Sequence, residues 1–108
     1  MKPAIPELSG RARRDLDDIR DWTIATWGRV QWQAYYRGLG AAFRRTASEP
    51  ECGRPRALLG VGVRSLAYEK HLIFFAPVAN FGGQTVILRI LHQRRNLAAV
   101  TYLDDLES

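Results

Sequence analysis

The side chains best suited to bind anions or transfer protons lie in the last third of the chain. One predicted strand ends at His92 and is followed by Arg94 and Arg95. The strand before it begins at His71, and the turn between the two strands brings the histidines within a residue or two of each other. We expect both imidazole rings to form caps or hydrogen bonds. Two histidines do not make a metal site without a third ligand, so we expect no metal and no cofactor.

The charge of the chain is positive and unevenly distributed. Its 16 Lys and Arg residues exceed its 11 Asp and Glu residues by five, and fourteen of the cations are arginine. From residue 53 to residue 102 the only acidic side chain is Glu69, whereas acids cluster at residues 15–21 and 104–107. Such a positive field favours a nucleic-acid or acidic-protein partner. The alternative is an arginine-rich composition that reflects genome base bias and a solvated surface.

The length and composition indicate one small globular domain. With 108 residues, of which 46% are hydrophobic, the chain can form one core but not two. We treat residues 1–108 as a single domain in which residues 97–108 are a C-terminal tail. No segment resembles a signal peptide or approaches the roughly 18 apolar residues that a membrane span needs. The single cysteine, Cys52, cannot form an internal disulfide, so we expect a cytoplasmic protein with no membrane partner.

Two helices joined by a short turn are predicted in the first half of the chain, forming an antiparallel hairpin. Ser9 is placed to cap the first helix, Gly28 to end it, and Pro50 to stop the second. Gly38 and Gly40 inside the second helix indicate either close packing or a kink. The aspartates of the first helix are expected in its early turns, where the helix dipole favours negative charge. Apolar residues at helical spacing predict the core-facing stripes, which are Ala12, Leu16, Ile19, Thr23 and Trp27 in the first helix and Trp32, Tyr35 or Tyr36, Leu39, Phe43 and Ala47 in the second.

The second half of the chain is predicted to form a meander of antiparallel strands. These strands are residues 61–68, 71–78 and 85–92. Before them, residues 51–60 form a loop that tucks Leu58 and Leu59 against the core, and residues 3–8, with two prolines, form an edge strand at best. The last two strands are nearly continuous in apolar residues, which predicts partial cover on both faces. The fold class is therefore α+β with the order β-α-α-β-β-β, in which the N-terminal helical hairpin packs on one face of a mainly antiparallel small sheet and leaves apolar surface for a partner.

Several short motifs occur in an order that is typical of one protein family. The strongest are the strand His71-Leu72-Ile73-Phe74-Phe75 and the ending Ile90-Leu91-His92-Gln93-Arg94. The others are Leu8-Ser9, Ala12, Asp15-Leu16, Ile19, Trp27-Gly28, Ala34, Leu39, Phe43, Pro50, Gly53-Arg54, Gly62 and Arg64. Over about residues 7 to 96 the chain thus resembles the ParE branch of the RelE/ParE toxin superfamily of bacterial type II toxin-antitoxin systems.

The resemblance implies a toxin that inhibits DNA gyrase, stalls it on cleaved DNA and blocks replication. It also implies neutralisation by a ParD-like antitoxin, a small dimeric DNA-binding protein with an acidic C-terminal segment that folds on the toxin in a hetero-oligomeric complex. The basic sheet half suits an acidic segment of this kind. The apolar face that the hairpin leaves open suits an amphipathic helix.

We expect two binding surfaces. The residues expected to bind the target, gyrase or DNA, are Arg64, Arg89, His92, Arg94 and Arg95. The residues expected to bind the antitoxin are Trp22, Trp32, Tyr36, Leu72 and Phe74. A simpler interpretation of the helix aromatics is packing in the core and within the hairpin.

A ribonuclease is the main alternative, because the RelE branch of the same fold cuts mRNA on the ribosome. That reaction needs a base for the ribose 2'-hydroxyl, cations for the phosphorane charge and an acid for the leaving oxygen. Arg64, Arg89 and His92 can supply a cation or an acid. However, Gln93 follows His92 and no tyrosine occupies this strand end, so we expect no enzymatic activity. A third possibility is an inactive member that only binds an antitoxin.

Overall fold

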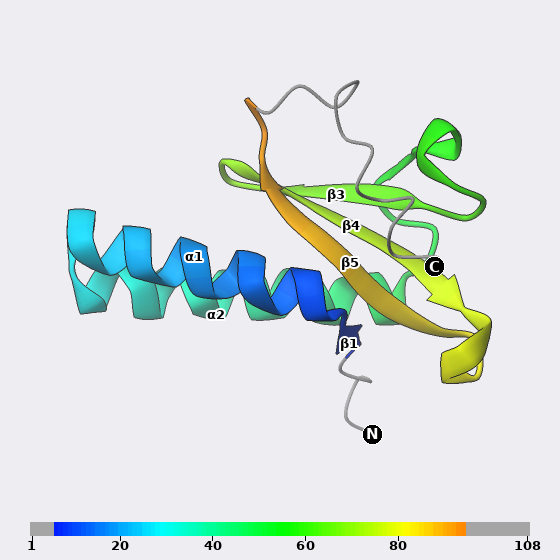
Figure 1. The fold of residues 1–108 in the computed structure, drawn as a ribbon, viewed down its shortest axis with the longest axis horizontal. Coiled ribbons are helices and arrows are strands. Elements are labelled where there is room, and N and C mark those ends of the chain that lie inside the picture. The colour runs from blue at the N-terminus through cyan, green and yellow to red at the C-terminus, as the bar shows by residue number, and fades with distance from the viewer. Residues whose placement is uncertain (1–5, 95–108) are drawn as a thin grey trace.

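A computed structural model describes residues 6–94 of the chain (Figure 1). The elements are β1 (Glu7–Leu8), α1 (Gly10–Trp27), α2 (Arg29–Ser48), β2 (Arg54–Pro55), β3 (Arg64–Tyr68), β4 (His71–Val78) and β5 (Gln84–His92), with 3-10 turns at Ala57–Leu59 and Ala79–Phe81. The five strands form one sheet in the order β1-β5-β4-β3-β2. Only the β1–β5 pair is parallel. The predicted α+β fold and its order of helices and long strands are confirmed, while the predicted tail lies outside the described residues.

Ser9 and Gly28 set the boundaries of the first helix, as predicted. The Ser9 hydroxyl accepts a hydrogen bond from the Ala12 amide at 3.0 Å and donates one to the Leu88 carbonyl at 2.8 Å. Ser9 therefore starts α1 and also holds that helix start against β5. Gly28, with a φ of 92°, ends α1 and directly precedes α2, so one glycine makes the whole turn between the two antiparallel helices.

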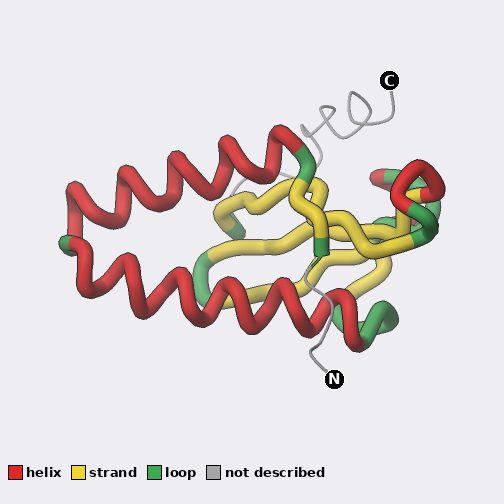
Figure 2. The backbone as a smooth tube through the Cα atoms, turned by 90° about the horizontal axis from the view of Figure 1, so that it is seen from below, coloured by secondary structure: helices red, strands yellow, loops and turns green. Residues whose placement is uncertain are grey.

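The two helices cover one face of the sheet, and their joined end extends beyond it (Figures 1 and 2). The core between the layers consists of Ala12, Leu39, Phe43, Leu66, Ile73, Phe75, Ile87 and Ile90. The predicted stripe of α1 is correct at Ala12 and Thr23, which are buried, but wrong at Trp27, which is exposed. In the second helix Thr46 rather than Ala47 is fully buried. Trp27 lies at the joined end of the hairpin, where there is no sheet for it to cover.

The opposite face of the sheet is apolar as well. Its buried cluster consists of Val63, Phe74, Ala76 and Leu91, with Leu59, Leu72 and Leu88 partly buried around it. Successive residues of β4 alternate between this cluster and the helix-side core, because side chains of a strand point to opposite faces. The prediction that the long strands carry apolar residues on both faces is confirmed.

The segment between α2 and β3 differs from the prediction in three places. Arg54 and Pro55 form the short strand β2, which pairs with the start of β3. The strand predicted from residue 61 begins only at Arg64. Leu59 packs against the second apolar cluster, but Leu58 is fully exposed, so the prediction for Leu58 was wrong. Neighbouring side chains of a tight 3-10 turn point in different directions, and only one of two consecutive leucines reaches the sheet.

A bulge in β5 changes the direction of its side chains. Phe74 pairs with Arg89 and Phe75 with Ile87, which leaves Leu88 as an extra residue. As a result Ile87 and Ile90, three positions apart, both reach the helix-side core, which strict alternation would forbid. Arg89, which follows the extra residue, binds Asp15 of α1.

Gly38 and Gly40 provide a paired test of packing in α2. A Cβ added at Gly38 would overlap the Tyr68 hydroxyl and ring, whereas one at Gly40 would meet only the end of Arg44, at 3.5 Å. Close packing therefore explains Gly38. We expect Gly40→Ala to raise the free energy of unfolding by up to about 1 kcal/mol through helix propensity. We expect Gly38→Ala to lower it by about 1–3 kcal/mol, because Tyr68 must leave its packed position.

Urea denaturation monitored by circular dichroism measures both effects. In a Tyr68→Ala background the clash is absent, so Gly38→Ala should become neutral or stabilising. An equal loss of stability from Gly38→Ala in both backgrounds would contradict this explanation.

Candidate partner-binding site between the hairpin and the sheet end

Two neighbouring cavities lie between the projecting hairpin and the end of the sheet. Their volumes are about 570 and 620 Å3, and both are lined by Trp22, Lys70 and His71. The first continues along the hairpin to Thr23, Trp27, Gln31, Ala34, Tyr35, Tyr68 and Glu69. The second continues along the end of β5 to Asp15, Asp18, Ile19, Arg89, Ile90, Leu91, His92 and Arg94. Trp22, Lys70 and His71 thus form the wall that both cavities share, and Trp22 is its largest side chain.

The site combines exposed apolar surface with charged side chains of both signs. Trp22 is 62% exposed and Trp27 is similarly exposed, which is unusual for such large apolar side chains. Lys70 and Arg94 contribute cations, and Asp18 and Glu69 contribute acids, to the cavity walls. Residues 6–94 as a whole contain fourteen basic and eight acidic side chains. The described part of the chain is therefore positive overall, whereas the cavity walls combine exposed apolar surface with charges of both signs.

The two histidines meet in the site, as predicted. His71 and His92 are directly opposite each other on β4 and β5, and their ring centroids are 5.5 Å apart in an edge-on arrangement. The predicted hydrogen-bonding roles are also confirmed. His71 Nδ1 lies 2.6 Å from the Tyr35 hydroxyl, and His92 Nδ1 accepts a hydrogen bond from the Arg94 amide at 3.1 Å.

Burial keeps the His71–Tyr35 pair uncharged at neutral pH. Burial, reinforced by the neighbouring His92 and opposed by Asp15, lowers the pKa of His71 to about 4. Burial, with smaller effects of Tyr68 and Glu69, raises the pKa of Tyr35 to about 12. At pH 7 the Tyr35–His71 hydrogen bond therefore joins two neutral groups, and its direction follows from the imidazole tautomer. This neutral bond joins α2 to the first residue of β4 at the wall of both cavities.

Arg89 is engaged within the fold. Its Nε and Nη2 atoms donate to the two carboxylate oxygens of Asp15, at 2.6 and 2.9 Å, and the side chains are only 10% and 13% exposed. Asp15 Oδ2 also accepts the Ile90 amide at 2.9 Å. This pairing occupies most of the guanidinium, and a contact of Arg89 with a target stays a prediction. The aspartates do not lie where the dipole is strongest, because the first turn of α1 contains no acid.

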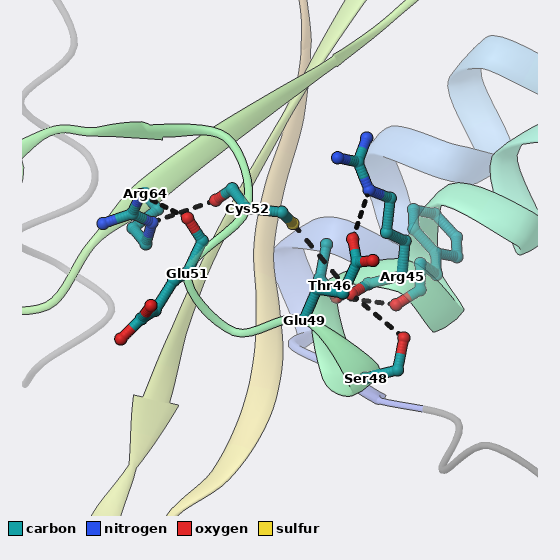
Figure 3. A network of polar contacts seen from close by, with 8 residues as sticks. Arg45, Thr46, Ser48, Glu49, Glu51, Cys52 and Arg64 are labelled. Carbon is teal, nitrogen blue, oxygen red and sulfur yellow. Dashed lines mark hydrogen bonds and ion pairs between the residues drawn. The ribbon is translucent and has the colours of Figure 1, made fainter.

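Arg64 holds the loop that follows α2. Its guanidinium donates to the carbonyl groups of Glu51 and Cys52 (Figure 3). It also donates to the Gly53 carbonyl, at the start of β3. Arg64 pairs with Phe75, whereas His92 pairs with His71. Four residues along β4 correspond to about 13 Å. Arg64, Arg89 and His92 therefore do not converge on a common point, as an RNA-cleaving centre would need.

The residues expected to bind an antitoxin lie in three different places. Trp22 lines both cavities. Trp32 and Tyr36 stack on each other along α2, with ring centroids 5.3 Å apart, and line neither cavity. Leu72 and Phe74 belong to the opposite face of the sheet, where Phe74 is completely buried and cannot contact a partner. Of the target residues, Arg89, His92 and Arg94 line the second cavity, Arg64 does not, and Arg95 lies outside the described residues.

The prediction missed Lys70, the cation common to both cavities, and it assigned no binding role to Trp27 or Tyr35. A signal for Lys70 was present, because it lies in the turn next to His71.

The thiol of Cys52 is half-buried and not in a disulfide, and burial raises its pKa. Among residues 6–94 no three metal-binding side chains come together, and neither of the two helices there is apolar enough to cross a membrane.

Comparison with known proteins defines the class. Residues 7–97 match the family described as the ParE toxin of type II toxin-antitoxin systems, parDE, so the chain belongs to the ParE toxin family. It is 37% identical over 99 residues to Toxin ParE1 of Caulobacter vibrioides, covering 92% of this chain and 97% of that protein. It is 33% identical over 90 residues to Toxin ParE1 of Mycobacterium tuberculosis, covering 83% and 90%. The solved chromosomal ParDE toxin-antitoxin system from P. aeruginosa has the same fold, with a TM-score of 0.65, 23% identity and coverage of 82% of this chain and 96% of that one.

The Asp15–Arg89 pair should be a major source of stability. We expect Asp15→Ala to lower the free energy of unfolding by about 3–5 kcal/mol, because the mostly buried Arg89 loses its bidentate carboxylate partner and the Ile90 amide loses its acceptor. Asp17→Ala is the matched control, since Asp17 forms an exposed ion pair with Arg20 worth at most about 0.5 kcal/mol. Urea denaturation measures both. Equal losses from the two variants would contradict the role given to Asp15.

His71 should make stability depend on pH in a defined window. Between its folded pKa of about 4 and its ordinary value of 6.5, the unfolded chain binds more protons at this residue than the folded chain. The contribution of His71 to stability is therefore present above pH 6.5 and declines as the pH falls toward 4. We expect the free energy of unfolding to fall more steeply with acid for the natural chain than for His71→Gln. Parallel curves for the two proteins would refute this expectation.

Proposed function

We propose that the chain is a non-enzymatic inhibitor of DNA gyrase, acting in the cytoplasm, and that a ParD-like antitoxin neutralises it in a hetero-oligomeric complex. Membership of the ParE toxin family supports the toxin class. Arg64 lies away from His92 and holds the loop after α2, and Arg89 is paired with Asp15, which supports action by binding rather than by cleavage.

One observation carries the proposal: expected antitoxin and target residues line the same cavity. Trp22, expected to bind the antitoxin, lies in the wall of the cavity that also contains His92 and Arg94, expected to bind the target. The sequence placed these residues about seventy positions apart. Their convergence provides a direct mechanism of neutralisation, because a segment bound against Trp22 covers the cations at the end of β5.

The chemistry of the cavities specifies the antitoxin segment. Trp22 and Trp27 offer apolar surface that a leucine or phenylalanine side chain can bury. Lys70 and Arg94 lie close enough to pair with acids at neighbouring positions of the same segment. Such a segment needs no fixed structure of its own before binding, because the cavity walls supply the order. Apolar contacts anchor it and charges orient it.

Trp22 should be the main anchor of the antitoxin. We expect Trp22→Ala to weaken binding of the antitoxin's C-terminal segment at least tenfold, because the variant removes the largest side chain of the wall common to both cavities. Tyr36→Ala is the control: it truncates a half-exposed aromatic residue of the same hairpin that lines neither cavity. Isothermal titration calorimetry measures both affinities. A larger loss from Tyr36→Ala would place the antitoxin on the outer side of α2.

Arg94 should be required for toxicity. We expect Arg94→Ala to reduce the gyrase–DNA cleavage complexes formed with purified enzyme about tenfold, because the strand end loses its exposed cation. Antitoxin affinity should change less and become less sensitive to salt, since apolar contacts remain. The control Arg44→Ala removes a cation of α2 that lines neither cavity. Codon-directed cleavage of ribosome-bound mRNA by the natural chain would overturn the proposal in favour of a ribonuclease.

A further inference from the structure

Two aliphatic side chains project fully into solvent from the loop before β3. Leu58 is 102% exposed and Val61 is 100% exposed relative to an extended reference chain. We call residues 57–62 the apolar loop. It joins β3 at Arg64, whereas Tyr68 at the other end of β3 lines the first cavity. The length of β3, about 13 Å, separates the loop from that cavity.

The apolar loop is held by its own hydrogen bonds. The amides of Leu59 and Gly60 donate to the carbonyls of Arg56 and Ala57, at 2.8 and 3.2 Å. The amide of Arg56 donates to the Val63 carbonyl at 2.8 Å and closes the base of the loop. Leu59 packs against the second apolar cluster, so it anchors the turn while Leu58 points outward. A bound partner would therefore gain from these side chains at a small cost in conformational entropy.

Polar contacts fix the base of the loop to the sheet and to α2. Arg56 Nε donates to the Ser65 hydroxyl at 2.8 Å. Arg64 donates to the carbonyls of the segment that connects α2 to β2, and the Arg45–Glu49 ion pair joins the end of α2 to that same segment (Figure 3). Gly53 has a φ of 77°, and a Cβ there would overlap the Ser65 carbonyl, so this segment lies directly against β3. The base of the loop is thus attached to both the sheet and the end of α2.

The charges around the loop indicate the character of its partner. Arg54 is exposed beside it, Arg56 lies at its base, and no acidic residue occurs from Gly53 to Tyr68. Aliphatic side chains cannot stack on bases as aromatic rings do, and they read no base edge, which disfavours a nucleic acid as the main contact. Two aliphatic groups within a cationic surround fit an apolar socket with an acidic rim on another protein.

We propose that the apolar loop is a second contact with the protein target, in which Leu58 and Val61 enter an acid-rimmed apolar socket. This inference rests on the proposed function, since it assumes a toxin that acts by binding a protein. The antitoxin does not bind this surface. The loop stays accessible when the cavities are occupied, and it adds affinity to the contact made by the end of β5 because both belong to one rigid sheet.

The double variant Leu58→Ser with Val61→Ser tests the inference in the full chain. Both side chains are fully exposed, so the unfolding midpoint should not change. We expect the concentration needed for half-maximal gyrase–DNA cleavage complexes to rise about tenfold, and the expression level needed for growth arrest to rise with it. Antitoxin affinity should stay within twofold of the natural chain. The control Val30→Ser removes an exposed aliphatic side chain from the hairpin. It should change neither the concentration needed for cleavage complexes nor the expression level needed for growth arrest.

The readouts separate failure of the inference from failure of the proposed function. If the natural chain stabilises no cleavage complexes but arrests growth, gyrase is not the target, and growth arrest alone then decides the role of the loop. Unchanged potency of the double variant in the growth assay overturns the inference. The inference is also overturned if the double variant loses as much antitoxin affinity as potency. Binding of the natural chain to vesicles of anionic phospholipid, abolished in the double variant, would assign the loop to a membrane surface and also overturn it.

Discussion

The buried ion pair between Asp15 and Arg89 is the interaction on which the arrangement of the site depends. It joins α1 to β5 at the bulge, and the same carboxylate satisfies the Ile90 amide, which β1 is too short to reach. Trp22 follows Asp15 by seven residues, or about two helical turns, and so lies on the same face of α1. Fixing Asp15 therefore also fixes the direction in which the hairpin projects and the distance of Trp22 from the sheet end.

The two cavities exist because the helical hairpin extends beyond the sheet. A helical hairpin longer than its sheet leaves its joined end without an apolar layer beneath it, which explains why Trp22 and Trp27 are exposed. The neutral bond between Tyr35 and His71 closes the same end from the side of α2. The cavities between these two attachments contain both the aromatic wall and the cationic strand end. A single bound segment can pack against the aromatic wall and cover the cationic strand end.

Local sequence signals predicted the helices and strands well because capping, backbone conformation and apolar runs act over a few neighbouring residues. Ser9 and Gly28 set helix ends through capping and a positive φ, and the apolar run from residue 71 to 78 formed a strand with the predicted bounds. The pairing of the histidines followed from one turn. What could not be predicted depends on long-range packing. That Arg89 pairs with Asp15 depends on where α1 lies against the sheet, and that Leu59 rather than Leu58 packs depends on where the sheet lies. Phe74 was expected to bind the antitoxin but is completely buried. Alternation along a strand predicts which residues share a face, but not which faces are covered.

The central claim is that one site serves both neutralisation and attack. The most direct test is a titration of the preformed toxin–gyrase–DNA cleavage complex with the isolated C-terminal segment of the antitoxin, followed by the amount of cleaved DNA and by the toxin that remains bound. Mutual exclusion is the predicted result: the segment releases the toxin, and the DNA is resealed in proportion to the cavity sites filled. A stable ternary complex in which the segment is bound while the DNA stays cleaved would contradict the account.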